Sequence, residues 1–162
     1  MKKTLIPIAL VFALCAIAPA AFAATASGTL TVNASVAANC TIAASATLAF
    51  GAYDPVVANA STGIDLDAQT TMGVACTKGF DPVITIPLAG RTITGGGDTL
   101  NYQLFSDSTR LASFGETVAT GFHMGAAPSK AARNVTLYVR IPKNQDVGVA
   151  AYTGTIQVSV NF

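Results

Sequence analysis

Hydrophobic and polar residues alternate along a short stretch near the start of the sequence, residues 29–36. Apolar side chains stand at Leu30, Val32, Ala34 and Val36, and the residues between them are Thr, Asn or Ser. Successive side chains of a β-strand point to opposite faces, so the pattern predicts a strand with one apolar and one polar edge. The same alternation returns at the end of the sequence and predicts a second amphipathic strand, with apolar residues Ile156, Val158, Val160 and Phe162.

Period-two patterns recur through the rest of the chain and predict many short strands. The clearest interior set is Val135, Leu137, Val139 and Ile141. Shorter sets are Leu48 and Phe50; Met72, Val74 and Cys76; Ile84, Ile86 and Leu88; and Leu100, Tyr102 and Leu104. Turn-forming pairs such as Asp54-Pro55 separate these sets. Short strands at this spacing predict an all-β fold, an antiparallel β-sandwich of immunoglobulin-like type.

The segment from residue 112 to residue 133 alternates poorly and is rich in Gly, Ala and Ser. We expect a long loop there, with one short edge strand around residues 116–120. Loops of this length are uncommon in compact domains, so further structure is expected within the segment.

The first 23 residues have the pattern of a secretory signal peptide. Lys2 and Lys3 provide a basic start, residues 5–17 are apolar, and Ala21-Phe22-Ala23 supplies small residues for cleavage after Ala23. A membrane anchor is the alternative, but prolines interrupt the apolar run and no positive stop follows it. We therefore expect the chain to be exported.

Cleavage after Ala23 leaves 139 residues (162 − 23), the size of one domain. Without Lys2 and Lys3, seven basic residues face eight acidic ones, a formal net charge of −1. The charges are scattered, without the basic run or stripe that binding to nucleic acid or to an anionic membrane requires. The sequence therefore disfavours both of these partners.

Two cysteines remain after cleavage, Cys40 and Cys76. An even number of cysteines in an exported protein predicts a disulfide, and closing this loop contributes about 4 kcal/mol in the chain-entropy model. Two buried free thiols are the alternative. With a single histidine in the chain, the two cysteines do not suffice for a four-ligand Cys/His zinc site, and we expect neither a metal nor a cofactor.

Catalytic signatures are missing around the residues that carry chemistry. His123 is the single imidazole and lacks the surroundings of a hydrolase triad. Asp65 and Asp67 could share one face of a strand, but the Gly and Glu of a twelve-residue calcium loop are not nearby, and we interpret both as solvated loop acids. The run Gly95-Gly96-Gly97 lacks the Lys-Ser/Thr of a phosphate-binding loop and is interpreted as a hairpin turn. No enzymatic activity is expected.

Several motifs follow one another along the chain: Asn39-Cys40, Leu48-Ala49-Phe50-Gly51-Ala52-Tyr53-Asp54-Pro55, Val74-Ala75-Cys76, Leu100-Asn101-Tyr102-Gln103-Leu104-Phe105-Ser106-Asp107, and the terminal run from Tyr152 to Phe162. Together they resemble the spore coat protein U domain, which is shared with pilin subunits of the archaic (Csu-type) chaperone–usher pili. The resemblance covers essentially all of the chain after the signal peptide. Relatives often have Trp-Gly where this chain has Phe114-Gly115.

This resemblance implies an incomplete immunoglobulin-like sandwich that lacks its final strand and leaves an apolar groove. A strand of a periplasmic pilus chaperone fills the groove first, and the N-terminal extension of the next subunit replaces it during polymerisation at an outer-membrane usher. We therefore expect residues 24–36 to be a donor strand and residues 37–162 the domain. The donor side chains are Leu30, Val32, Ala34 and Val36, whose burial contributes about 5–8 kcal/mol. The groove-edge C-terminal strand carries Ile156, Val158, Val160 and Phe162.

The function expected from the resemblance is that of a structural pilus subunit, exported through the periplasm to the cell surface and serving adhesion and biofilm formation. Its partners are the chaperone, the usher and other copies of itself or related pilins. One alternative is a secreted coat or matrix protein that forms no ordered fibre, and another is a minor subunit or tip adhesin that binds a surface ligand. Residues 29–36 could also be the domain's own first strand.

Overall fold

The computed structural model describes residues 24–43 and 46–162, and the chain separates into two compact units, Met1–Ala34 and Ser35–Phe162. In the described part of the first unit, residues 24–34, the side chains are exposed and no strand is formed. The expected signal peptide lies outside the described residues. Within the part of the chain that the structure describes, we find no helix with the length and apolar character needed to span a membrane.

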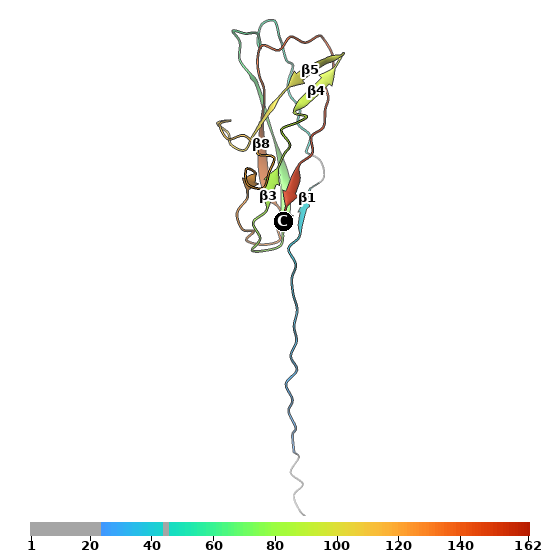
Figure 1. Cartoon of the computed structure of the whole chain (residues 1–162), viewed down its shortest axis with the longest axis vertical. Helices are drawn as coiled ribbons and strands as arrows, with labels where there is room; N and C mark the ends of the chain where they lie inside the picture. Colours follow the sequence, from blue (N-terminus) through green and yellow to red (C-terminus); the bar gives the residue numbers. More distant parts are fainter. Residues whose placement is uncertain (1–23, 44–45) are drawn as a thin grey trace, which may run out of the picture. The chain divides into compact units, whose positions relative to one another are not determined.

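The second unit is built from antiparallel strands (Figure 1). The largest sheet has the order β1-β2-β8-β6, a second sheet has the order β7-β3-β9, and β4 pairs with β5. Their bounds are β1 Cys40–Ile42, β2 Leu66–Cys76, β3 Val83–Thr85, β4 Thr92–Gly95, β5 Asp98–Asn101, β6 Gln103–Phe105, β7 Phe122–His123, β8 Arg133–Ile141 and β9 Ser159–Asn161. The arrangement confirms the predicted all-β, immunoglobulin-like sandwich.

The two longest strands, β2 and β8, form the centre of the main sheet because both sequences alternate cleanly. They pair from Leu66 opposite Ile141 to Val74 opposite Arg133. Side chains of one parity are at most 6% exposed: Met72, Val74 and Cys76 on β2, and Val135, Leu137, Val139 and Ile141 on β8. The predicted inward parity of both strands, including that of Cys76, is confirmed.

The glycine run closes the hairpin between β4 and β5. Gly95 and Asp98 are register partners, so the loop consists of Gly96 and Gly97 alone. Both residues have a positive φ, 64° and 96°, as a two-residue type I′ turn requires and as residues with a Cβ rarely adopt. The interpretation of this run as a hairpin turn is confirmed.

One predicted strand is divided between two pairing partners. Leu100 belongs to β5, which pairs with β4, whereas Leu104 belongs to β6, which pairs with β8. At the junction the N–H of Tyr102 donates to the carbonyl of Arg91 at 2.9 Å. Leu100, Tyr102 and Leu104 all face inward, as their alternation predicts, although they do not belong to one continuous strand.

The segment 112–133 is ordered by a turn and by buried side chains. The N–H of Thr120 donates to the carbonyl of Thr117 at 3.1 Å, which closes a turn where an edge strand is expected. The edge strand of this segment is β7, which pairs with β3 just beyond that turn. Phe114 and Ala127 are 1% and 3% exposed and add to the core. The expected position of the edge strand at residues 116–120 is therefore wrong.

Two further predicted strands are shorter than their patterns indicate. Ile84 and Ile86 are fully buried, but Leu88 is 54% exposed because the chain turns after Pro87. Leu48 and Phe50 pack against the core and are half-buried, yet they belong to no strand. Their segment instead borders an open groove.

Candidate functional site

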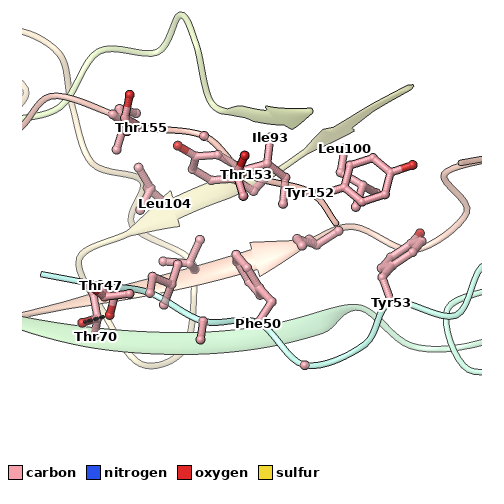
Figure 2. A pocket seen from close by; sticks show the side chains of 18 of the residues that line it. Thr47, Phe50, Tyr53, Thr70, Ile93, Leu100, Leu104, Tyr152, Thr153 and Thr155 are labelled. Atoms are coloured by element: carbon pink, nitrogen blue, oxygen red, sulfur yellow. Dashed lines mark hydrogen bonds between the residues drawn. The ribbon is translucent and has the colours of Figure 1, made fainter. Parts of the chain in front are cut away.

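An apolar groove of about 1040 Å³ opens along the second unit. Inward-facing side chains of the main sheet form its floor: Met72, Leu104, Leu137, Val139 and Ile141. One wall is the segment 46–53, and the opposite wall is the segment 147–156. Figure 2 shows both walls, with Thr47, Phe50 and Tyr53 on one and Tyr152, Thr153 and Thr155 on the other.

Part of the backbone beside the groove lacks backbone partners on each side. Among the described residues, neither 48–52 nor 154–158 forms a backbone–backbone hydrogen bond. Buried backbone N–H and C=O groups are almost always paired, and a row of unpaired groups beside an apolar floor is a template for another strand. The groove therefore has the lining and the free backbone groups of a missing strand position.

Hydrogen bonds fix the two walls at one end of the groove. The hydroxyl of Tyr53 donates to the carbonyl of Pro142 at 3.0 Å and accepts the N–H of Gln145 at 2.9 Å. On the second wall, Thr153 and Thr94 exchange two backbone hydrogen bonds of 3.0 Å, which attach the wall to the β4–β5 hairpin. The groove is therefore largely preformed at this end.

The groove carries no charge. In the described part of the chain its lining consists of aliphatic, aromatic, Thr and Gly residues. Burial raises the pKa of the Tyr102 phenol. Burial, and then the nearby charge of Asp98, also raise the pKa of Tyr152. Both tyrosines are thus neutral at physiological pH, and the site is suited to an apolar, uncharged guest.

The alternating N-terminal segment is fully accessible. Leu30, Val32 and Val36 are 88%, 80% and 84% exposed, and Ala34 is exposed as well. Residues 24–39 form no strand, and the first strand of the domain begins at Cys40. Four apolar side chains at two-residue spacing, three of them large, are thus unburied in the isolated chain, an arrangement that usually marks an interaction site.

The base of this segment is fastened to the main sheet. The N–H of Thr77 donates to the carbonyl of Asn39 at 2.9 Å, and the N–H of Asn39 donates to the Thr77 hydroxyl at 3.0 Å. Next to this pair, a disulfide joins Cys40 to Cys76, which are register partners of β1 and β2. The predicted disulfide is confirmed, and it lies where the exposed segment meets the domain.

The residues of the last amphipathic segment lie beside the second wall. Ile156 and Val158 line the groove and are half-buried. Val160 lies in β9, opposite Ile84 of β3, and packs against the core. Phe162 is 58% exposed. The strand is therefore restricted to Ser159–Asn161, and the part that borders the groove is extended but unpaired.

The titratable residues singled out in the sequence lie elsewhere. Asp67 is a strand residue rather than a loop acid, and its carboxylate accepts two hydrogen bonds from Arg140, at 2.8 and 3.1 Å. Asp65 lies 3.4 Å from the same guanidinium. His123 faces Asp81 across 3.4 Å at an exposed position. Among the described residues, no group of three His, Cys, Asp or Glu side chains is arranged to hold a metal ion.

Sequence patterns revealed the end of the second wall, at Ile156, but not its beginning, residues 147–151. Its residues Gly148, Ala150 and Ala151 are too small to mark a face, so the alternation that identifies other segments is absent there. The hydrogen bond between Tyr53 and the segment just before the second wall was also missed. The motif that contains it was noted, but a hydrogen bond between residues 92 positions apart leaves no local signal.

The fold and the groove define an immunoglobulin-like β-sandwich with one open strand position. The sequence model of the spore coat protein U domain matches residues 26–159, so the chain belongs to this family. It is also 33% identical over 127 residues to Protein U of Myxococcus xanthus, with 70% of each sequence covered. The family is a structural one, and the comparisons give no support to an enzymatic role.

A solved structure shows the same fold. It is the pre-assembly complex of the chaperone CsuC with the tip adhesion subunit CsuE, from archaic chaperone-usher Csu pili of Acinetobacter baumannii. The match has a TM-score of 0.53 at 20% sequence identity and covers 78% of this chain. The present chain spans 40% of the length of the matched chain.

Proposed function

We propose that this protein is a structural subunit of a surface fibre of the chaperone–usher type, and that residues 24–36 of one copy fill the groove of the next. One combined observation carries the proposal. The groove has an apolar floor and is bordered by two stretches without backbone partners, 48–52 and 154–158, and the same chain presents an exposed segment with the matching alternation. Strand addition of this kind takes its affinity from main-chain hydrogen bonds and its specificity from alternate side chains.

The match between segment and groove is chemical as well as geometric. Leu30, Val32, Ala34 and Val36 share one parity, and every second side chain of an added strand would face the uncharged floor. Transfer of these four side chains from water contributes about 5–8 kcal/mol, before the backbone hydrogen bonds are counted. The intervening Thr29, Thr31, Asn33 and Ser35 face water in this arrangement.

A second copy of the chain is a better acceptor than the chain's own groove. Asn39 is held against Thr77 by two hydrogen bonds, one between backbone groups and one from the N–H of Asn39 to the threonine hydroxyl. The carbonyl of Ala37 accepts from the same hydroxyl. To fold back, the segment would have to reverse direction before Ala37, and a tight turn needs at least two residues. Residues 35 and 36 would then form the turn, and Val36 would leave the apolar set.

The same proposal assigns the remaining partners and the location. A subunit with an open groove exposes a large apolar surface until the donor arrives, so it requires a periplasmic chaperone that covers the groove and an outer-membrane usher where the exchange occurs. The support is the likeness in fold to a chain of a chaperone–subunit complex. Adhesion and biofilm formation would follow from fibres on the cell surface.

A secreted coat or matrix protein is the second candidate, and the family description, spore coat protein U domain, favours it. The same groove could then join subunits without an ordered fibre. Electron microscopy of cells that express the chain with its chaperone and usher separates the two candidates. Thin fibres that contain the protein support the pilus, and an amorphous layer supports the coat.

Strand addition itself is tested by self-complementation. In one variant, residues 24–36 are deleted from the N-terminus and appended after Phe162 through a short Gly/Ser linker. The expected product is a soluble monomer with a cooperative thermal transition. The matched control carries Val32→Asp in the appended copy, which should lower the midpoint because a carboxylate meets an apolar floor. Equal midpoints for the two proteins would show that the segment does not occupy the groove.

A further inference from the structure

The second unit has two chemically different ends, which the register of β2 defines. At the Cys76 end lie the disulfide, Asn39 and Thr77. The loop 54–64 lies at the Leu66 end. Leu66 pairs with Ile141, and two residues further on the N–H of Lys143 donates to the carboxylate of Asp65, which directly follows the loop. The eleven residues of β2 separate these ends by about 36 Å. Figure 1 shows the same separation, with β1 and β3 toward one end and β4 and β5 toward the other.

The link between donor strand and domain is short. Val36 is the last donor residue, and Asn39 is already fixed to Thr77 by two hydrogen bonds. Three residues extend over about 11 Å at most. If residues 24–36 fill a neighbour's groove, as the proposed function requires, the Cys76 end of the donor copy must lie against the end of the acceptor groove at which the donor strand leaves.

Symmetry decides at which end of the acceptor groove the donor strand leaves. The groove runs from Ile42 and Ala43, at the Cys76 end, to Tyr53 and Pro55, at the Leu66 end. If the donor left at the Cys76 end, like ends would meet, and such a contact closes into a dimer rather than an open fibre. A fibre therefore requires the donor to leave at the Leu66 end, so that unlike ends meet at every joint.

The two ends are complementary in charge. Lys78 and Lys130 are exposed at the Cys76 end, where Lys130 lies beside Asn39 and the disulfide. Asp81 at this end faces His123. The Leu66 end exposes the carboxylates of Asp98 and Asp146.

The Leu66 end also carries an exposed apolar patch. Val56, Val57 and Ile64 of the loop 54–64 are 80%, 72% and 75% exposed. The loop that carries them is held by the side chains of Asp54 and Asn59, which bond its backbone. The basic residues of this end are engaged within the domain, since Lys143 donates to the carbonyl of Gly63 and Arg140 pairs with Asp65 and Asp67. A fixed loop that presents apolar side chains beside carboxylates is suited to a protein contact.

We infer that the Leu66 end of each copy binds the Cys76 end of the next copy through the valines of the loop 54–64 and through attraction between Asp98 and Asp146 on one side and Lys78 and Lys130 on the other. This inference rests on the proposed function. The contact makes each joint stiff, because it holds the two domains in one orientation that the donor strand alone does not impose.

The test measures the persistence length of purified fibres on electron micrographs. Lys78→Glu with Lys130→Glu should shorten it severalfold while fibres still form, because the donor strand is unchanged. Addition of Asp146→Lys should restore it in part, since the joint again has opposite charges. High salt should mimic the double variant. Gln69→Glu with Gln103→Glu, on the exposed face of the main sheet, is the control and should leave the persistence length unchanged.

Val56→Ser with Val57→Ser should shorten the persistence length as well. If the charge and valine variants have fibres as stiff as those of the unmodified chain, the inferred contact is wrong while strand donation stands. If the valine variant keeps its stiffness but loses binding to an apolar surface, the loop is an adhesive site and the inference is also overturned. Failure of the unmodified chain to form fibres would instead refute the proposed function.

Discussion

The hydroxyl of Tyr53 accepts the N–H of Gln145 at 2.9 Å and so ties the first wall of the groove to the segment that leads into the second wall. The same hydroxyl donates to the carbonyl of Pro142. One side chain thereby attaches the end of the first wall to residues 142–145. This contact fixes one end of the groove, as the proposed function as a strand-binding site requires.

Replacement of Tyr53 by Phe should loosen this end of the groove. The ring remains, but the N–H of Gln145 loses its partner, and the carbonyl of Pro142 keeps only the bond from the side-chain amide of Gln145, at a cost of about 1–2 kcal/mol. The thermal midpoint of the self-complemented variant should fall accordingly. Tyr138→Phe, on the outer face of the main sheet, is the matched control and should change the midpoint little. An equal effect of both changes would contradict a special role of Tyr53.

Reduction of the disulfide should release the base of the donor segment. Because β1 has only three residues, the Cys40–Cys76 bond is its main attachment beyond the register hydrogen bonds. Cys40→Ala with Cys76→Ala should lower the free energy of unfolding by up to about 4 kcal/mol. Thiol titration of the denatured, unreduced protein should find no free thiol at these positions, and two free thiols would contradict the bond.

Alternation predicted most of the sheet because period two reports which face of a strand is buried. The inward residues of β2 and β8 are buried as expected, and the parity of Cys76 placed it where the disulfide forms. The same signal does not report a strand's partner. It therefore missed the change of pairing at Tyr102 and assigned a strand to Leu48 and Phe50, which face the core without pairing.

The groove could be expected only through the family resemblance. A missing strand is an absence between two segments that lie about a hundred positions apart in the sequence, and no local pattern records it. The beginning of the second wall leaves no pattern for a further reason, since Gly148, Ala150 and Ala151 lack side chains large enough to mark a face. The segment 112–133 was misread because turn chemistry, through Thr117 and Thr120, determines its course.

Acid should weaken the domain through aspartates that are bonded in the folded state. The hydrogen bonds from Arg140 hold the pKa of Asp67 below the 3.8 of an unperturbed aspartate. Backbone N–H groups of Val56 and Val57 lower the pKa of Asp54 in the same direction. Because the folded pKa values are depressed, this stabilisation is present above pH 3.8 and is lost as the pH falls through the lower folded values.

The pH dependence of the thermal midpoint tests whether stability is lost as the pH falls. Asp67→Asn should lower the midpoint at pH 7 and should converge with the unmodified protein near the acid limit, where Asp67 is protonated in both states. Asp146→Asn is the control, because within the described residues the Asp146 side chain has no hydrogen bond or ion pair. Parallel profiles for Asp67→Asn and the unmodified protein would show that the Asp67–Arg140 pair does not contribute to the acid sensitivity.

Two neighbouring substitutions in the donor segment test polymerisation in the complete chain. Val32→Asp places a carboxylate on the apolar edge, where an unpaired charge in an uncharged groove costs several kcal/mol or forces its pKa upward. Thr31→Asp places the same group on the edge that faces water. Fibre yield from cells should fall strongly for Val32→Asp and little for Thr31→Asp. The amount of chaperone-bound subunit should be the same for both, because the groove that the chaperone covers belongs to residues 42–158. If both variants polymerise equally, or if Val32→Asp also abolishes the chaperone complex, residues 29–36 act within their own domain and donation between copies is refuted.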